Sequence, residues 1–187
     1  MTLVGAYFAQ RFPISVFGPV VALIAGAALW SVESASGTAA TRALALSALL
    51  VTQFRIWDDL RDRERDRRTH PERILTRASV GPFRAICAAL SMVSAILCLA
   101  SPPALAVLVA TNAAFWFAYD VLRPQIPDTT WQFGVLPAKY PAFLCIAGPA
   151  IGVPSPGRLA MATLVAYLAA IAYEYWHHAP ATAGVSR

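Results

Sequence analysis

The sequence predicts an all-α fold, a polytopic transmembrane helix bundle of about six spans with its N- and C-termini in the cytoplasm. Of the 187 residues, 58% are hydrophobic and only 13% are charged, and the mean hydropathy is +0.56. A soluble domain carries about 25% charged residues. Most of this surface is therefore expected to face lipid, and we expect residues 1–187 to form a single transmembrane domain.

Six apolar stretches approach the roughly 20 residues that a helix needs to cross a bilayer. The expected spans are Ile14–Val32, Thr38–Trp57, Val80–Ala100, Pro103–Tyr119, Phe133–Val153 and Leu159–Trp176. The fifth stretch contains Lys139 between Pro137 and Pro141. Because backbone groups freed by proline need internal partners in lipid, we expect this stretch to be kinked or to line a polar cavity. Asn112, in the fourth stretch, is expected to form hydrogen bonds between helices.

Arginines are concentrated on one side of this predicted topology. The loop after the second span carries Arg61, Arg63, Arg65, Arg67, Arg68, Arg73 and Arg77, and Arg11, Arg123 and Arg187 fall on the same side. The opposite loops hold only Arg42 and Arg158. Because cytoplasmic loops are rich in Arg and Lys, we expect this loop and both termini to face the cytoplasm of a bacterial-type inner membrane. The net charge of +5 fits this topology, so no nucleic-acid partner is expected.

The loop at residues 58–79 contains closely spaced aspartates and arginines, the residues of the chain best suited to bind a metal ion and phosphate. If it continues the second span as a helix, Asp58, Asp62 and Asp66 recur at i, i+4 and i+8 and share a face, with Asp59 beside them. Carboxylates at a membrane surface can hold Mg²⁺, which shares its ligand shell with phosphate oxygens, and arginines bind phosphate with two hydrogen bonds. The pattern therefore indicates a metal–diphosphate site. The charge pattern alone equally allows a solvated helix with Asp–Arg pairs and no chemistry.

The run from Asp58 to Asp66 resembles the first Asp-rich motif of the UbiA superfamily of intramembrane prenyltransferases, with Asp58 in place of the family's asparagine. The following His-Pro-Glu-Arg stretch, which includes Arg73, is similar to the stretch that trails that motif. Tyr119 to Arg123 is similar to a further family element.

The resemblance implies an enzyme that transfers a prenyl group from a prenyl diphosphate to a lipid or aromatic acceptor. It implies Mg²⁺ as cofactor, and membrane lipids as surroundings. The residues implied as catalytic are Asp59, Asp62 and Asp66. Those implied as metal ligands are Asp58, Asp59, Asp62 and Asp66, with Glu174 in place of a second motif. Those implied as substrate-binding are Arg73, Tyr119, Arg123 and Lys139.

A second, non-catalytic interpretation stays open because the sequence carries no second Asp-rich motif. The chain would then be an inactive accessory or structural subunit of a larger membrane complex that binds lipid or quinone. Its partners would be other membrane-protein subunits or further copies of itself. Two other enzyme classes share part of the pattern, the soluble isoprenyl synthases and the CDP-alcohol phosphotransferases. The six apolar stretches argue against the first, and the lack of glycine between Asp58 and Asp66 argues against the second.

Overall fold

The computed structural model describes residues 2–35 and 37–178. Within these residues the chain is helical and contains no β-strand, apart from one isolated bridge between Val32 and Pro154. The all-α prediction is therefore confirmed.

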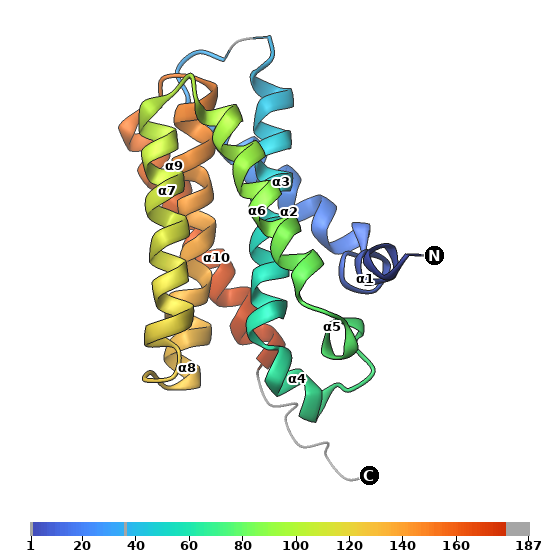
Figure 1. The fold of residues 1–187 in the computed structure, drawn as a ribbon. Helices are drawn as coiled ribbons and strands as arrows, with labels where there is room; N and C mark the ends of the chain where they lie inside the picture. Colours follow the sequence, from blue (N-terminus) through green and yellow to red (C-terminus); the bar gives the residue numbers. More distant parts are fainter. Residues whose placement is uncertain (1, 36, 179–187) are drawn as a thin grey trace, which may run out of the picture.

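The helices follow the chain in an order close to the predicted one. They are α1 (Leu3–Arg11), α2 (Ile14–Ser31), α3 (Ala39–Arg61), α4 (Arg63–Thr69), α5 (Ile74–Arg77), α6 (Gly81–Cys98), α7 (Pro102–Phe117), the π-helix η1 (Ala118–Leu122), α8 (Asp128–Thr130), the π-helix η2 (Trp131–Val135), the 3₁₀-helix η3 (Leu136–Ala138), α9 (Lys139–Ile151) and α10 (Pro156–His178). The long helices run up and down a bundle, as Figure 1 shows. The short helices α4, α5 and α8 lie at one end, below the long helices in that view.

Helix α3 lies at the centre of this bundle and packs against α2, α6 and α9. Its apolar side chains Leu46, Leu50 and Phe54 are almost fully buried. Helix α9 also packs against α7, α2 and α10. These contacts place the core along α3 and α9, so the other long helices turn much of their surface outward.

Five of the described helical segments are long and apolar enough to cross a membrane. They are Ile14–Ser31, Gly81–Cys98, Pro102–Leu122, Asp128–Ile151 and Pro156–Trp176. The chain is therefore compatible with an integral membrane protein. The second predicted span, which forms α3, is 23 residues long but contains Arg42 and Arg55 and is not among the five. Since α3 is enclosed by other helices, its surface meets protein more than lipid, and its sequence need not be uniformly apolar.

The fifth predicted span is irregular, as the prolines indicate. It begins with the π-helix η2, continues through one 3₁₀ turn that contains Pro137, and becomes a regular α-helix only from Lys139. The Lys139 side chain is buried where the regular helix starts. The irregular turns thus place the ammonium group of Lys139 inside the bundle and not on its surface.

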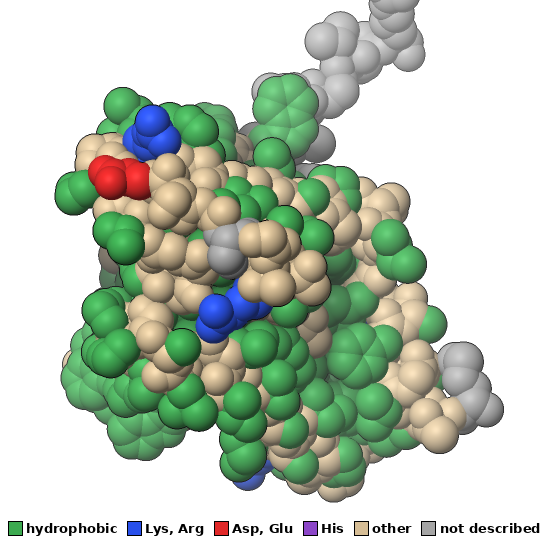
Figure 2. Space-filling model, turned by 90° about the horizontal axis from the view of Figure 1, so that it is seen from above, with side chains coloured by type: hydrophobic (Ala, Val, Ile, Leu, Met, Phe, Trp, Pro, Cys, Tyr) green, Lys and Arg blue, Asp and Glu red, His purple; other side chains and the backbone are tan. Residues whose placement is uncertain are grey.

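The two ends of the bundle differ in charge. Figure 2 views the end that joins α2 to α3 and α6 to α7, where few charged side chains lie among hydrophobic and uncharged polar ones. The opposite end contains α4 and α5, whose 11 residues include five arginines, Arg63, Arg65, Arg67, Arg68 and Arg77. The asymmetry seen in the sequence is thus an asymmetry between the two ends of the molecule.

Candidate functional site

The four predicted aspartates lie where α3 passes into α4. Although α3 ends at Arg61 and α4 begins at Arg63, helical hydrogen bonds continue across Asp62. The amide of Asp62 donates to the carbonyl of Asp58 at 2.9 Å, and the amide of Asp66 donates to the carbonyl of Asp62 at 2.8 Å. The predicted helical spacing of the carboxylates is therefore present. Three of their side chains, however, pair with cations from different segments, and the fourth, that of Asp62, has no partner among the described residues.

Asp58 joins three segments that are distant in the sequence. Its carboxylate forms an ion pair with Lys139 and accepts a hydrogen bond from the hydroxyl of Tyr119. Asp58 is 8% exposed and Lys139 is 7% exposed. A buried charge needs a partner of opposite sign and further hydrogen bonds to be tolerated, and these three residues provide both. The structure thus brings together three residues that were predicted separately as metal and substrate ligands.

Aromatic rings pack around Tyr119, which donates to this ion pair. The ring centroid of Tyr119 lies 5.6 Å from that of Trp57, 5.0 Å from that of Trp131 and 6.1 Å from that of Phe115. Their faces carry negative electrostatic potential, which favours a nearby cation. The surroundings of Asp58 are therefore apolar, yet suited to positive charge.

Asp59 faces the opposite side and holds the N-terminal helix α1. It accepts hydrogen bonds from the Tyr7 hydroxyl at 2.9 Å and from Arg11 at 2.9 Å (Nε) and 2.5 Å (Nη2), and the Arg55 guanidinium lies 3.6 Å away. Burial raises the pKa of Tyr7 well above its usual range, and the charge of Asp59 adds to this effect. The phenol therefore stays protonated and remains a donor. Sequence reasoning missed Tyr7 and used Arg11 only for topology, because nothing in the local pattern indicates which helix folds against Asp59.

Asp66 closes the loop after α4. It forms an ion pair with Arg73 at 2.6 Å. Asp59, Asp66, Arg11 and Arg73 line a cavity of about 10 Å³ between α1 and the α4–α5 loop, which is room for roughly one water molecule. Arg73, predicted to bind substrate, is thus occupied by a carboxylate.

The arginine Arg63 braces the same loop. Its guanidinium donates to the carbonyls of Leu75 at 2.9 Å and Ala78 at 2.8 Å. Interactions of this kind satisfy carbonyls at the end of a short helix that would otherwise lack partners. The loop therefore has a defined shape around the carboxylates.

Asp62 differs from the other three aspartates. Within the described part of the chain its carboxylate takes part in no hydrogen bond or ion pair. Burial and the negative charges of Asp58 and Asp66 together raise the pKa of this carboxyl to about 6, against the opposite effect of Arg65 and Arg123. Asp62 is therefore the carboxylate that is available to an incoming cation.

Arg123 and Glu174 complete the predicted set. Arg123 forms an ion pair with Asp128 at 2.6 Å, and its guanidinium carbon lies 5.3 Å from the ring centroid of Trp131. Glu174 lies near the C-terminal end of α10, which Figure 1 places toward the same end of the bundle as α4. Its role as a metal ligand stays a prediction.

The predicted magnesium ligands have side chains of the right chemistry, but the structure does not bring them together. Four carboxylates without thiol or imidazole partners suit a hard cation such as Mg²⁺. Among the residues that the structure describes, however, no three or more His, Cys, Asp or Glu side chains converge closely enough to hold one metal ion. The site of Mg²⁺ therefore stays a prediction.

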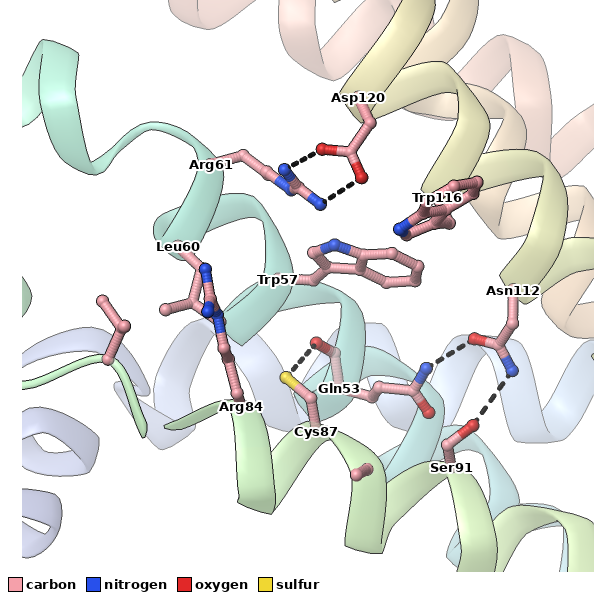
Figure 3. Close-up of a pocket in the computed structure, with 12 residues that line it drawn as sticks. Gln53, Trp57, Leu60, Arg61, Arg84, Cys87, Ser91, Asn112, Trp116 and Asp120 are labelled. Atoms are coloured by element: carbon pink, nitrogen blue, oxygen red, sulfur yellow. Dashed lines mark hydrogen bonds and ion pairs between the residues drawn. The ribbon is translucent and has the colours of Figure 1, made fainter. Parts of the chain in front are cut away.

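A larger pocket of about 650 Å³ lies beside the aspartates, between α3, α6 and the α7–η1 segment (Figure 3). Arg61 and Asp120 form a two-pronged ion pair at one end, with Nη2 and Oδ2 2.9 Å apart. At the other end Gln53 donates to Asn112 at 2.6 Å, and Asn112 donates to Ser91 at 3.1 Å. The prediction that Asn112 hydrogen-bonds between helices is confirmed. The pocket itself was not predicted, since its residues come from three separated segments.

Comparison of the chain with protein-family models, curated proteins and solved structures finds no match. The resemblance to the UbiA superfamily therefore depends on the motifs quoted above.

Proposed function

We propose that this protein is an intramembrane, Mg²⁺-dependent prenyltransferase that binds a prenyl diphosphate at the aspartates between α3 and α4. The observation that carries the proposal is the convergence of Asp58, Tyr119 and Lys139 beside the aromatic rings that pack on Tyr119, one helical turn from the unpartnered carboxylate of Asp62. Such an arrangement combines a charged site for a diphosphate with an apolar, cation-tolerant site for the prenyl group.

The proposed topology has six spans, in which α3 is the central one. The arginine-rich end with α4 and α5 would face the cytoplasm of a bacterial-type inner membrane, together with both termini. The concentration of arginines at that end supports this orientation, because positively charged loops are retained in the cytoplasm.

The proposed reaction breaks the bond between the first prenyl carbon and the diphosphate oxygen. The electron pair leaves with the diphosphate, and the allylic cation that remains is attacked by a nucleophilic lipid or aromatic acceptor, which then loses a proton. The rings of Trp57, Tyr119 and Trp131 would lower the energy of the cation. The surrounding apolar side chains would keep water from capturing it.

The charged side chains at the site would stabilise the negative charge of the departing diphosphate. Lys139 and Arg73 are each held by an aspartate, at Asp58 and Asp66. Asp62 is the unpaired ligand that would first receive Mg²⁺, and Asp58, Asp59 and Asp66 would complete the metal-binding set. When bound, Mg²⁺ would neutralise the diphosphate and so stabilise the charge that develops on it. Lys139 and Arg73 would then be released from Asp58 and Asp66 to donate to the diphosphate oxygens, and Arg123 would exchange Asp128 for the diphosphate.

Binding of a non-hydrolysable prenyl diphosphate analogue to the detergent-purified protein tests this proposal. We expect binding that requires Mg²⁺ and is weakened about tenfold or more in Asp62→Asn, since one charge-assisted ligand contributes roughly 1.5–3 kcal/mol. The matched control is Glu64→Gln, because Glu64 lies two residues away in the first turn of α4 but is 67% exposed, and its ion-pair partners among the described residues are the surface residues Arg67 and Arg68. Binding that is independent of Mg²⁺, or equal in Asp62→Asn and the wild type, would contradict the proposal.

A second function is favoured by one specific observation. Asp58, Asp59 and Asp66 are already neutralised by cations of the chain itself, as expected for a set of residues that now stabilises the fold. The chain would then be an inactive subunit of a membrane complex that binds lipid or quinone. Copurification of a stoichiometric membrane partner, together with no analogue binding by the folded protein, would favour this function over the enzyme.

A further inference from the structure

The pocket between α3, α6 and α7 has a polar mouth, apolar walls and a polar inner end, and it is separate from the aspartate ion pairs. Figure 3 shows Arg61, Arg84 and Asp120 around one side and Gln53, Asn112 and Ser91 at the other. The two lining helices α6 and α7 belong to segments apolar enough to cross a membrane. The pocket thus lies along the depth of the expected bilayer, where lipids rather than soluble metabolites are the abundant ligands.

One cation at the mouth is available to a ligand. Arg61 is neutralised by Asp120, whereas the exposed Arg84 takes part in no side-chain hydrogen bond or ion pair within residues 2–35 and 37–178. Arg84 is in the first turn of α6, at the expected edge of the membrane. A guanidinium in this position suits the phosphate of a lipid headgroup, which accepts two parallel hydrogen bonds.

The walls supply donors at the depth of lipid ester groups. Trp57 reaches the pocket from α3 and Trp116 from α7 (Figure 3). Trp116 is 56% exposed although it lies in an apolar helix. No described residue accepts a hydrogen bond from either indole N–H, and an indole nitrogen can only donate. Ester carbonyls, which only accept, are complementary to these two groups.

The inner end keeps a further polar atom without a partner. The Oε1 atom of Gln53 is buried and has no hydrogen-bond partner in the described structure, while its amide nitrogen is held by Asn112. Buried polar atoms are rarely left unsatisfied in a closed core. Because this atom has almost no accessible surface, a ligand in the pocket does not reach it, and the inner end presents the hydrogen-bonded side chains of Gln53, Asn112 and Ser91 as its polar wall.

We propose that this pocket is a binding site for an anionic phospholipid, with its phosphate on Arg84, its ester carbonyls on Trp57 and Trp116, and its acyl chains leaving between α6 and α7. The pocket adjoins the diphosphate site proposed above through Trp57, whose ring also contacts Tyr119, whereas Arg84 and Trp116 make no contact with Asp58, Asp59, Asp62 or Asp66 among the interactions of the described residues. A zwitterionic lipid would place its positive group beside Arg84 and is expected to bind less tightly.

Quenching of tryptophan fluorescence by brominated lipids tests the site. The full chain is reconstituted in phosphatidylcholine nanodiscs that contain increasing fractions of brominated phosphatidylglycerol or, in parallel, brominated phosphatidylcholine. We expect saturable quenching at low fractions of the anionic lipid only, and a smaller amplitude of this quenching in Trp116→Phe, in which Trp57 remains at the site. Arg84→Gln should weaken the apparent affinity about fivefold or more, since it removes one charge-assisted contact.

The control variant is Arg68→Gln, which removes an arginine that is 79% exposed at the same end of the bundle and outside the pocket. Arg68→Gln should leave the quenching curve unchanged, which excludes a general effect of net charge. Addition of inorganic phosphate separates the two sources of the anion: unchanged quenching supports a lipid site, and full competition would overturn it in favour of a site for free anions. Equal quenching by both lipids, or an unchanged curve in Arg84→Gln, would also overturn the proposal.

Discussion

Individual side chains decide what the aspartates of this protein do. Asp58, Asp59 and Asp66 have neighbouring positions in the sequence and the same chemistry, yet each is paired with a cation from a different segment. Of the four aspartates, Asp62 is the one whose carboxylate has no partner among the described residues. A single motif is thus divided into three structural anchors and one available ligand.

The contacts of Asp59 with Tyr7, Arg11 and Arg55 lead to a prediction about the stability of the fold. Asp59→Asn should destabilise the fold by roughly 3 kcal/mol, because it leaves Arg11 and Arg55 beside a neutral group in a buried position. Tyr7→Phe should cost less, about 1–2 kcal/mol, because it removes one hydrogen bond to a charged acceptor. Thermal unfolding in detergent measures both effects, and limited proteolysis should cut first near α1 in Asp59→Asn.

Glu64→Gln is again the matched control and should leave unfolding unchanged, since both partners of Glu64 are on the surface. If Asp59→Asn were as stable as the wild type, Asp59 would not be the anchor of α1, and its role as a metal ligand would gain weight.

At the scale of the elements, close contacts between loops hold the bundle together at the end away from the aspartates. The amide of Glu33 donates to the carbonyl of Val153 at 3.0 Å, and the amide of Ser155 donates to the carbonyl of Ser31 at 2.8 Å. These bonds join the α2–α3 connection to the α9–α10 connection. Gly152 lies at the closest approach, where a Cβ atom would meet the backbone oxygen of Ser34 at 2.7 Å.

This contact predicts that Gly152→Ala destabilises the protein. A backbone oxygen cannot move aside as a flexible side chain can, so the loops must separate, at a cost of roughly 1–3 kcal/mol. Gly26→Ala is the control, because a Cβ atom there meets nothing within 4 Å, and alanine is favoured over glycine inside a helix by roughly 0.5–1 kcal/mol. Thermal unfolding should show a lower midpoint for Gly152→Ala and an equal or higher one for Gly26→Ala; equal midpoints for the two variants would refute the close approach.

At the scale of the whole molecule, the two ends of the bundle differ in charge. Apolar helices with outward-facing side chains connect an arginine-rich end to an end with few charges. Such a molecule is expected to lie in a membrane in one orientation, because moving a cluster of arginines across the lipid is costly.

Labelling of single cysteines tests the orientation. With the three native cysteines replaced by alanine, a cysteine at Glu72 should react with a membrane-impermeant thiol reagent only after cells are opened, and a cysteine at Arg158 should react in intact cells. Glu72 lies in the α4–α5 loop and Arg158 at the start of α10, at opposite ends of the bundle, and both positions are exposed. The reverse pattern would place the aspartates outside the cytoplasm and would remove the proposed access to cytoplasmic prenyl diphosphate.

The sequence by itself determined the helical class, the apolar segments, the arginine-rich end and the helical spacing of the aspartates. These features depend on composition and on contacts between residues close along the chain, such as the i, i+4 bonds across Asp62. They follow from short-range chemistry, which a sequence displays directly.

Only the tertiary structure decided which partner each charge receives. Tyr7 and Arg11 reach Asp59 across about fifty residues, Lys139 reaches Asp58 across 81, and three separated helices are needed to form the pocket beside Trp57. No local pattern specifies such pairs, because any of several arginines satisfies an aspartate equally well in the sequence. Packing around the central helix α3 makes the selection, since each buried carboxylate must take the cation that the surrounding helices bring to it.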